Sequence, residues 1–243
     1  MYLDAFSFIL IMFAGLIITT LSSAVGFGDK IALIAVLTLF IDIKLAIVIA
    51  AIYSLIVYST RIMFFHGHLN KNLLKTTMLF LLPGLAAGLF VFSFINIEIL
   101  KISFYVFLIF FVLYKLSRLA PDFSIKKKGL CLSVFLFGLL EGAIGAAGPL
   151  LGVSLLQYGK RKERFIVFAA SLFLISGVIR LIAYYFMGMV NFTDLYLVLP
   201  LAFVAVLGTY LAKKLVKILP VKVFEYIVLG LLCVVAVKGL FFS

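Results

Sequence analysis

Charged residues are scarce in this sequence. Asp, Glu, Lys and Arg together make up 12% of the 243 residues, whereas 66% of the residues are hydrophobic. A typical soluble domain has about 25% charged and about 45–50% apolar residues. The shortage of charge therefore excludes an ordinary soluble domain, and the long apolar runs in its place predict an integral membrane protein.

Cysteine is also rare, and catalytic motifs are missing. Cys131 and Cys233 are the only two cysteines, and both lie inside apolar runs without another ligand at a metal-binding spacing. This excludes a disulfide framework and gives no support for a metal site. No nucleophile–base pair, phosphate-binding loop or dinucleotide fingerprint occurs in the context that it requires. We therefore expect a protein that is not an enzyme and that holds no cofactor and no metal.

The basic residues are grouped in short stretches between the apolar runs. A formal net charge of +12 would favour nucleic acid binding in a soluble protein, but between apolar runs the basic residues indicate membrane topology. With an external N-terminus and alternating sides, all but four of the 21 Lys and Arg residues fall on the inner side; the exceptions are Lys44, Lys101, Arg180 and Lys238. This bias predicts a multi-pass protein of the cell (inner) membrane, surrounded by lipid, with both termini outside and no nucleic acid partner.

The apolar runs follow the same order in the two halves of the chain. They fall at 5–24, 28–42, 45–66, 74–95 and 99–117, and then at 130–145, 149–158, 165–187, 195–212 and 223–241. A shift of 119 residues places Gly26 on Gly145 and Arg61 on Arg180, which indicates an internal duplication. An odd number of segments per half makes the two copies inverted. We predict an all-α polytopic membrane protein with two inverted repeats of about five helical segments each. The first repeat is 1–118, a basic cytoplasmic linker is 119–128, and the second repeat is 129–243.

Each half contains a glycine-rich break near its start, at residues 26–30 and 142–149. Glycine permits turns and proline removes an amide donor, so the helix must stop there. In lipid, such breaks persist only where the backbone faces protein or a polar cavity. Segment 149–158 covers only about 15 Å, half of a bilayer core, so 130–158 is predicted to be a re-entrant hairpin. By symmetry, 5–42 would form another, and the re-entrant or discontinuous helices would meet near the midplane. The alternative is a first arm that crosses fully, which places Asp29 and Lys30 in the inner headgroup region.

These glycine patterns resemble the sulfite exporter TauE/SafE family, whose members carry a G-x-G-G-G-P-like motif near the start of each of two homologous halves. Gly145-Ala146-Ala147-Gly148-Pro149-Leu150 is similar to the second copy, and Gly26-Phe27-Gly28-Asp29-Lys30-Ile31 to the first, with Asp29-Lys30 where the family usually has Gly and Pro. The resemblance implies a secondary transporter that moves sulfite, sulfoacetate or a related organosulfonate outward and is driven by the proton gradient. The oligomeric state is left open, a homodimer being one option.

The breaks supply the residues that we expect to bind the anion. A helix that begins after a glycine break presents free N–H groups and a positive dipole end, and residues 147–150 form such a start. Arg180 would offer a planar donor fork if it faces the cavity; the alternative for Arg180 and Arg61 is snorkelling to the nearest interface. The predicted substrate-binding residues are Ser22, Ser23, Gly26, Gly28, Lys30, Gly145, Ala146, Ala147, Gly148 and Arg180.

Two carboxylates are candidate proton carriers. Asp29 belongs to the first break, and Glu141 lies about one helical turn before Gly145. Ionisable residues inside a membrane are costly and usually mark a substrate or proton path. The alternative is a structural role for Glu141 and a solvated loop position for Asp29.

The main prediction is a proton-coupled exporter of a small sulfur-containing anion. Two alternatives stay open. One keeps the fold but transports another solute, such as a carboxylate, a sulfur amino acid or a cation, and Asp29 is the reason to retain it. The other is a non-transporting membrane scaffold, which the paired glycine breaks disfavour.

Overall fold

All regular structure in the described part of the chain is α-helical. The computed structural model describes residues 4–66, 69–96, 98–99, 102–103, 105–106, 109–110, 113, 126–145, 147–158, 162–190 and 197–215. The helices are α1 (Ala5–Val25), α2 (Asp29–Leu37), α3 (Ile43–Phe65), α4 (Lys71–Phe94), α6 (Lys127–Ala143), α7 (Gly148–Tyr158), α8 (Lys162–Phe186) and α9 (Val198–Leu215). Four of them, α1, α3, α4 and α8, are long and apolar enough to cross a membrane. The prediction of a polytopic helical membrane protein agrees with this architecture.

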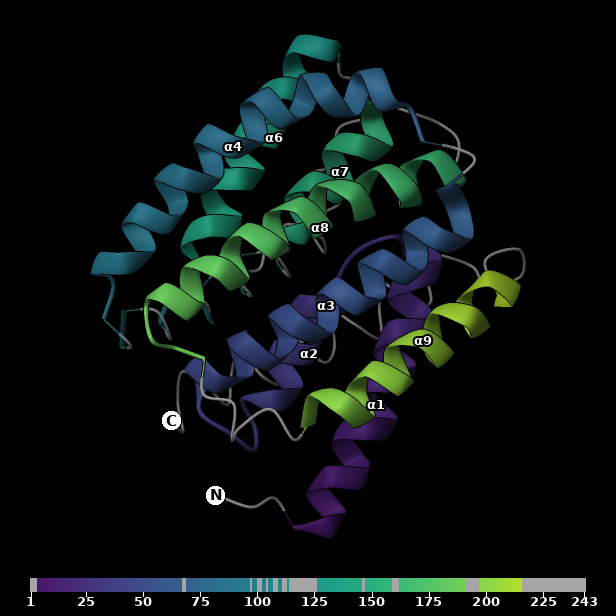
Figure 1. Cartoon of the computed structure of the whole chain (residues 1–243), viewed down its shortest axis with the longest axis vertical. Helices are drawn as coiled ribbons and strands as arrows, with labels where there is room; N and C mark the ends of the chain where they lie inside the picture. Colours follow the sequence, from purple (N-terminus) through teal and green to yellow (C-terminus); the bar gives the residue numbers. More distant parts are fainter. Residues whose placement is uncertain are drawn as a thin grey trace.

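The long helices pack as three pairs (Figure 1). Helices α3 and α8 lie side by side in the middle, flanked by the α1–α9 pair on one side and the α4–α6 pair on the other. Each flanking pair joins a helix of one half of the chain to a helix of the other half. The short helices α2 and α7 contact α1 and α6, respectively, and also contact the central helices. Large apolar side chains such as Phe6, Phe90 and Phe203 project from the outer helices, as expected for surfaces that meet lipid.

The two helix breaks follow directly from their glycines. Gly26 and Gly28 have φ values of 103° and 97°, and Gly145 has a φ value of 85°, a left-handed region in which a side chain is strained. Helix α2 is nine residues long and α7 eleven, or about 14 and 17 Å. Neither reaches across a bilayer core of about 30 Å. Both breaks therefore lie inside the protein, between a long arm and a short one.

The second short helix matches its predicted segment of 149–158, but the first is shorter than the predicted 28–42. Helix α2 ends at Leu37, and the chain turns through residues 38–42 before α3 begins. The Asp42 side chain accepts a hydrogen bond from the backbone N–H of Lys44, which caps the start of α3. The predicted segment at 223–241, most of the linker and much of the segment at 99–117 lie outside the described residues.

Helices α4 and α6 approach closely through glycines on their facing sides. An added Cβ on Gly138 or Gly142 would lie 2.7 Å from a backbone oxygen of α4, and one on Gly84 or Gly88 would overlap a backbone oxygen of α6. Small residues four apart permit such backbone contact between membrane helices. This crossing holds α6, and therefore the residues just before the second break, against α4.

A leucine at Gly88 is expected to destabilise the α4–α6 crossing. Overpacking a tight contact costs about 1–3 kcal/mol, and more where backbone must move. The thermal unfolding midpoint of purified Gly88→Leu in detergent should therefore fall by several degrees. Ala87→Leu is the matched control, because Ala87 is exposed on the outer side of the same helix turn. Equal midpoints for the two variants would contradict the proposed role of the crossing.

Candidate functional site

The two glycine breaks meet in the interior of the protein. A Cβ built on Gly148 lies 3.9 Å from the backbone nitrogen of Gly28. Phe27 packs over Gly152 of α7, where an added Cβ would lie 2.6 Å from the Phe27 ring. The first break of one half is therefore fitted against the short helix of the other, and at Gly152 only glycine leaves the necessary space.

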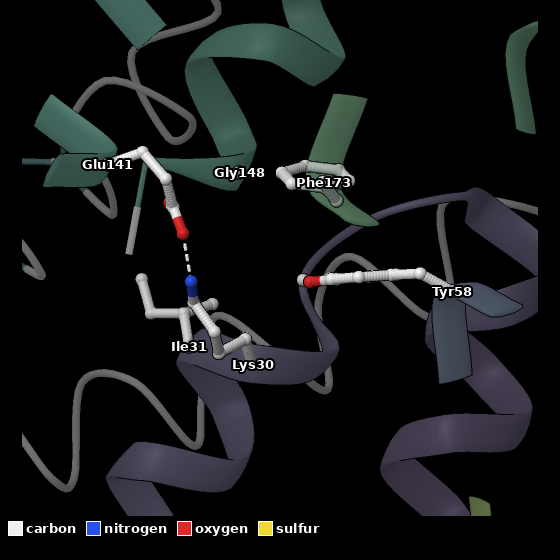
Figure 2. A pocket seen from close by; sticks show the side chains of 7 residues that line it. Lys30, Ile31, Tyr58, Glu141, Gly148 and Phe173 are labelled. Carbon is white, nitrogen blue, oxygen red and sulfur yellow. Dashed lines mark hydrogen bonds and ion pairs between the residues drawn. The ribbon is translucent and has the colours of Figure 1, made fainter. Parts of the chain in front are cut away.

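A small cavity lies where the breaks meet (Figure 2). Two glycines, Gly28 and Gly148, supply backbone to its wall, and the other lining residues are Lys30, Ile31, Tyr58, Glu141 and Phe173. The space open to the centre of a water molecule is about 10 Å³, room for roughly one water. The aromatic rings of Tyr58 and Phe173 stack with centroids 5.0 Å apart, which closes one side.

The carboxylate of Glu141 is the centre of this site. Figure 2 shows the ion pair between Lys30 Nζ and Glu141 Oε1. The same oxygen accepts a hydrogen bond of 3.0 Å from Arg180 Nη1, and Oε2 accepts one of 3.0 Å from the backbone N–H of Ala147. Glu141 is 1% exposed. The buried carboxylate thus accepts hydrogen bonds from a lysine, an arginine and a backbone amide beside the start of α7. These three donors are of the kind that binds anions.

Arg180 uses only part of its donor capacity. Its guanidinium packs against the bare backbone of Gly145, with an added Cβ 2.7 Å from Nη1, and stands over the ring of Tyr184 at 4.9 Å. Arg180 Nε and Nη2 and the Tyr184 hydroxyl have no hydrogen-bond partner within the described part of the protein. Buried donors without partners are unfavourable by about 1–3 kcal/mol each. The second half therefore keeps unused donors beside the cavity.

Arg61 is used much more fully. Its Nε donates to Ser23 Oγ at 3.0 Å and its Nη1 to the Gly26 carbonyl at 3.2 Å. Its Nη2 donates to Ser22 Oγ at 3.1 Å and to Asp29 Oδ1 at 2.9 Å. These partners come from α1, from the break itself and from α2. Arg61 thus clamps the first break, and the residue is fully buried.

The two arginines occupy equivalent positions but have different partners. With the shift of 119 residues, Ser22 corresponds to Glu141, and Asp29 corresponds to Gly148. Each half has one carboxylate near its break, after the break in the first half and before it in the second. In the first half the carboxylate joins the clamp through Asp29 Oδ1, and Oδ2 has no hydrogen-bond partner within the described residues. In the second half the carboxylate faces the cavity and Lys30.

The predicted site residues fall into two groups. Gly28, Lys30, Gly148 and Glu141 line the cavity, and Ala147 and Arg180 reach it through the Glu141 carboxylate. The structure does not bring the remaining described residues into the cavity wall: Ser22, Ser23, Gly26 and Asp29 hold Arg61, and Gly145 supports Arg180. Ala146 lies outside the described residues.

Burial decides two alternatives that the sequence left open. Asp29 and Lys30 are 0% and 7% exposed, so the solvated loop position considered for this pair is wrong. Arg61 and Arg180 are 0% and 1% exposed, so snorkelling to an interface is also wrong. Both arginines pair with carboxylates inside the protein. These ion pairs replace the hydration that the guanidinium groups would have kept at an interface. In the described part of the chain, no three His, Cys, Asp or Glu residues cluster in a way that could hold a metal ion.

The sequence reasoning missed the apolar and aromatic wall of the cavity. Tyr58 lies three residues before Arg61 on α3, and Phe173 lies seven residues before Arg180 on α8. Residues three or seven apart share one face of a helix. The spacing from the two arginines was therefore the signal that could have located this pair.

The comparisons with known proteins identify the family of this chain. The family described as sulfite exporter TauE/SafE matches residues 11–239, which include both breaks and both arginines. No curated protein and no solved structure matches the chain. Because the match covers nearly the whole sequence, the chain belongs to the sulfite exporter TauE/SafE family of membrane transporters.

Proposed function

We propose that this protein is a secondary active transporter that exports a small sulfur-containing anion, such as sulfite, sulfoacetate or a related organosulfonate, coupled to protons. The observation that carries the proposal is the position of the Glu141 carboxylate. This carboxylate binds Lys30, Arg180 and the Ala147 amide. The same donors suit the oxygens of a sulfonate or a sulfite. Glu141 is an internal anion tethered at the substrate site.

Protonation of Glu141 is the coupling step of this mechanism. A neutral carboxyl group no longer balances the charges of Lys30 and Arg180, and a substrate anion then takes its place on them. When the substrate leaves, the carboxylate loses its proton and returns to the cations. Because the anion binds only while the carboxyl group of Glu141 holds a proton, the anion and the proton move together. Asp29, the other candidate proton carrier, is assigned instead to the clamp with Arg61.

The substrate requires the two breaks to separate, because the cavity has room for roughly one water. Helix α1 of the first half packs on α9 of the second, and α4 of the first half packs on α6 of the second. This packing supports two inverted repeats that rock against each other. The end of α3, the starts of α4 and α8 and the end of α9 lie at one end of the molecule (Figure 1). The sequence around these helix ends is rich in basic residues. This supports an orientation in the inner membrane in which that end of the molecule faces the inner side.

Other solutes are less well supported by the geometry. A cation would need a carboxylate that is free of basic partners, yet Asp29 and Glu141 each bind a basic side chain. Asp29 Oδ2 has no hydrogen-bond partner in the described part of the protein, but the charge of this carboxylate is balanced by Arg61. A carboxylate substrate fits the same donors, so it is the second candidate. Direct competition between sulfite and small carboxylates separates the two.

The experiment is transport by the purified full chain in proteoliposomes. We expect efflux of labelled sulfite to accelerate when the side that holds the sulfite is made acidic, and we expect unlabelled sulfoacetate to compete more strongly than acetate. Protein-free liposomes and vesicles that contain Arg180→Ala should show only background efflux. Failure to move any tested anion under either gradient would overturn the proposed function.

A further inference from the structure

The charges around the cavity are unequal in number. Lys30 and Arg180 both bind Glu141 Oε1, whereas Arg61 and Asp29 form a separate pair. Within the described residues the site thus holds two cations and one carboxylate. The other helices packed around Glu141 do not change this balance. Helix α4 has no charged residue after Lys75, α7 has none, and the nearby titratable groups of α3 and α8 are the phenols of Tyr58 and Tyr184.

An excess charge is expensive in a site from which water is excluded. When Glu141 is ionised, its carboxylate occupies the donors and no anion can bind. When Glu141 is protonated, two cations lose their counter-charge: Lys30 in the cavity wall and Arg180, which contacts the Glu141 carboxyl group. A substrate with two negative charges balances them. A substrate with one negative charge leaves a buried cation uncompensated. Charge balance therefore favours a dianion bound together with one proton.

Lys30 is the residue that creates the excess. The equivalent position in the second half is Pro149, which carries no charge. Without Lys30, Arg180 and Glu141 would match one to one, and the protonated site would suit a single negative charge. Resting on the proposed function, we infer that this site selects small dianions, transports each with one proton, and owes this selection to Lys30.

The test uses pairs of anions that differ mainly in charge. Sulfate and methanesulfonate share a tetrahedral sulfur head, and sulfoacetate and isethionate share a two-carbon sulfonate, but the first of each pair carries one more negative charge at neutral pH. We expect each dianion to inhibit labelled sulfite efflux from proteoliposomes at a concentration about tenfold or more below that of its partner. Lys30→Gln should remove or reverse this preference.

Control variants separate charge selection from general damage. Lys30→Arg retains the charge and should retain the preference for dianions. Lys75→Gln removes an exposed lysine at the start of α4 and should behave as the wild type. If Lys30→Gln transports sulfite with the wild-type preference for dianions, the assignment to Lys30 is wrong.

Wild-type protein alone gives a second measurement, which does not depend on the folding of any variant. A dianion that moves with one proton carries one net negative charge, so sulfoacetate transport should respond to an imposed membrane potential. Sulfite transport without discrimination within either pair, or sulfoacetate transport insensitive to the potential, would overturn this inference and leave the proposed function intact. Absence of any anion transport would instead reject the proposed function itself.

Discussion

Glu141→Gln is expected to abolish proton-driven transport while preserving exchange of anion for anion. Glutamine keeps the shape of the side chain but carries no charge and takes up no proton, so Lys30 and Arg180 remain permanently available. Labelled sulfite inside proteoliposomes should still exchange with unlabelled sulfite outside. Efflux driven by a proton gradient should fall to the level of protein-free vesicles.

The same variant should also depend on the anion for its stability. Removing one partner from a buried ion pair costs about 3–5 kcal/mol, because the opposite charges stay buried without compensation. A bound anion restores the balance, and saturation at about 100 times the dissociation constant adds about 2.7 kcal/mol. We therefore expect a lower unfolding midpoint for Glu141→Gln than for the wild type, and a larger rise of that midpoint when sulfite is added.

Glu98→Gln is the control for both measurements, because Glu98 is exposed. Its coupling and its unfolding midpoint should match those of the wild type. Proton-driven efflux that survives in Glu141→Gln at the wild-type rate would remove Glu141 from the coupling step. Such a result would return Asp29, the second buried carboxylate, to consideration as the proton carrier.

Arg61→Ala is expected to be the most destabilising single substitution at the two breaks. It removes four hydrogen bonds and leaves Asp29 without its cation. The loss of a buried partner costs about 3–5 kcal/mol, a large share of the roughly 5–15 kcal/mol by which proteins are typically stable. The yield of monodisperse protein in detergent should fall sharply, along with its unfolding midpoint.

Two comparisons identify the clamp as the cause. Arg61→Ala combined with Asp29→Asn should recover part of the stability, because the double variant no longer buries an unpaired carboxylate. Arg180→Ala should lose transport but less stability, because Glu141 keeps Lys30 and the Ala147 amide as partners. Equal stability losses for the two arginine variants would contradict the division of the equivalent arginines into a clamp and a binding residue.

Both breaks were predictable because their cause is local. Glycines within apolar sequence end a helix wherever they occur, and an apolar stretch of about ten residues is too short to cross a bilayer. The length of the apolar segment 149–158 therefore predicts a short helix without any knowledge of its contacts. The equivalence of Arg61 and Arg180 was also visible, because a duplication leaves its period in the sequence.

The partners of those arginines were not predictable in the same way. Ser22 and Ser23 had the right chemistry for an anion site, yet they bind Arg61 because α3 passes beside the first break. Glu141 and Lys30 are separated by 111 residues, and no local pattern pairs them. Hydrogen bonding and ion pairing act over a few ångströms, so the packing of distant helices decides which groups come within reach.

The sequence by itself determined that this is a helical membrane protein with two glycine-broken halves, because hydrophobicity and backbone freedom are properties of each residue and its neighbours. Only the tertiary structure decided that the breaks meet, that one arginine closes a clamp while the other shares a carboxylate with Lys30, and that this carboxylate fills the donors predicted for an anion. Those outcomes depend on which buried charges balance one another in a site with almost no water. Such a balance belongs to the assembled helices and not to any one segment.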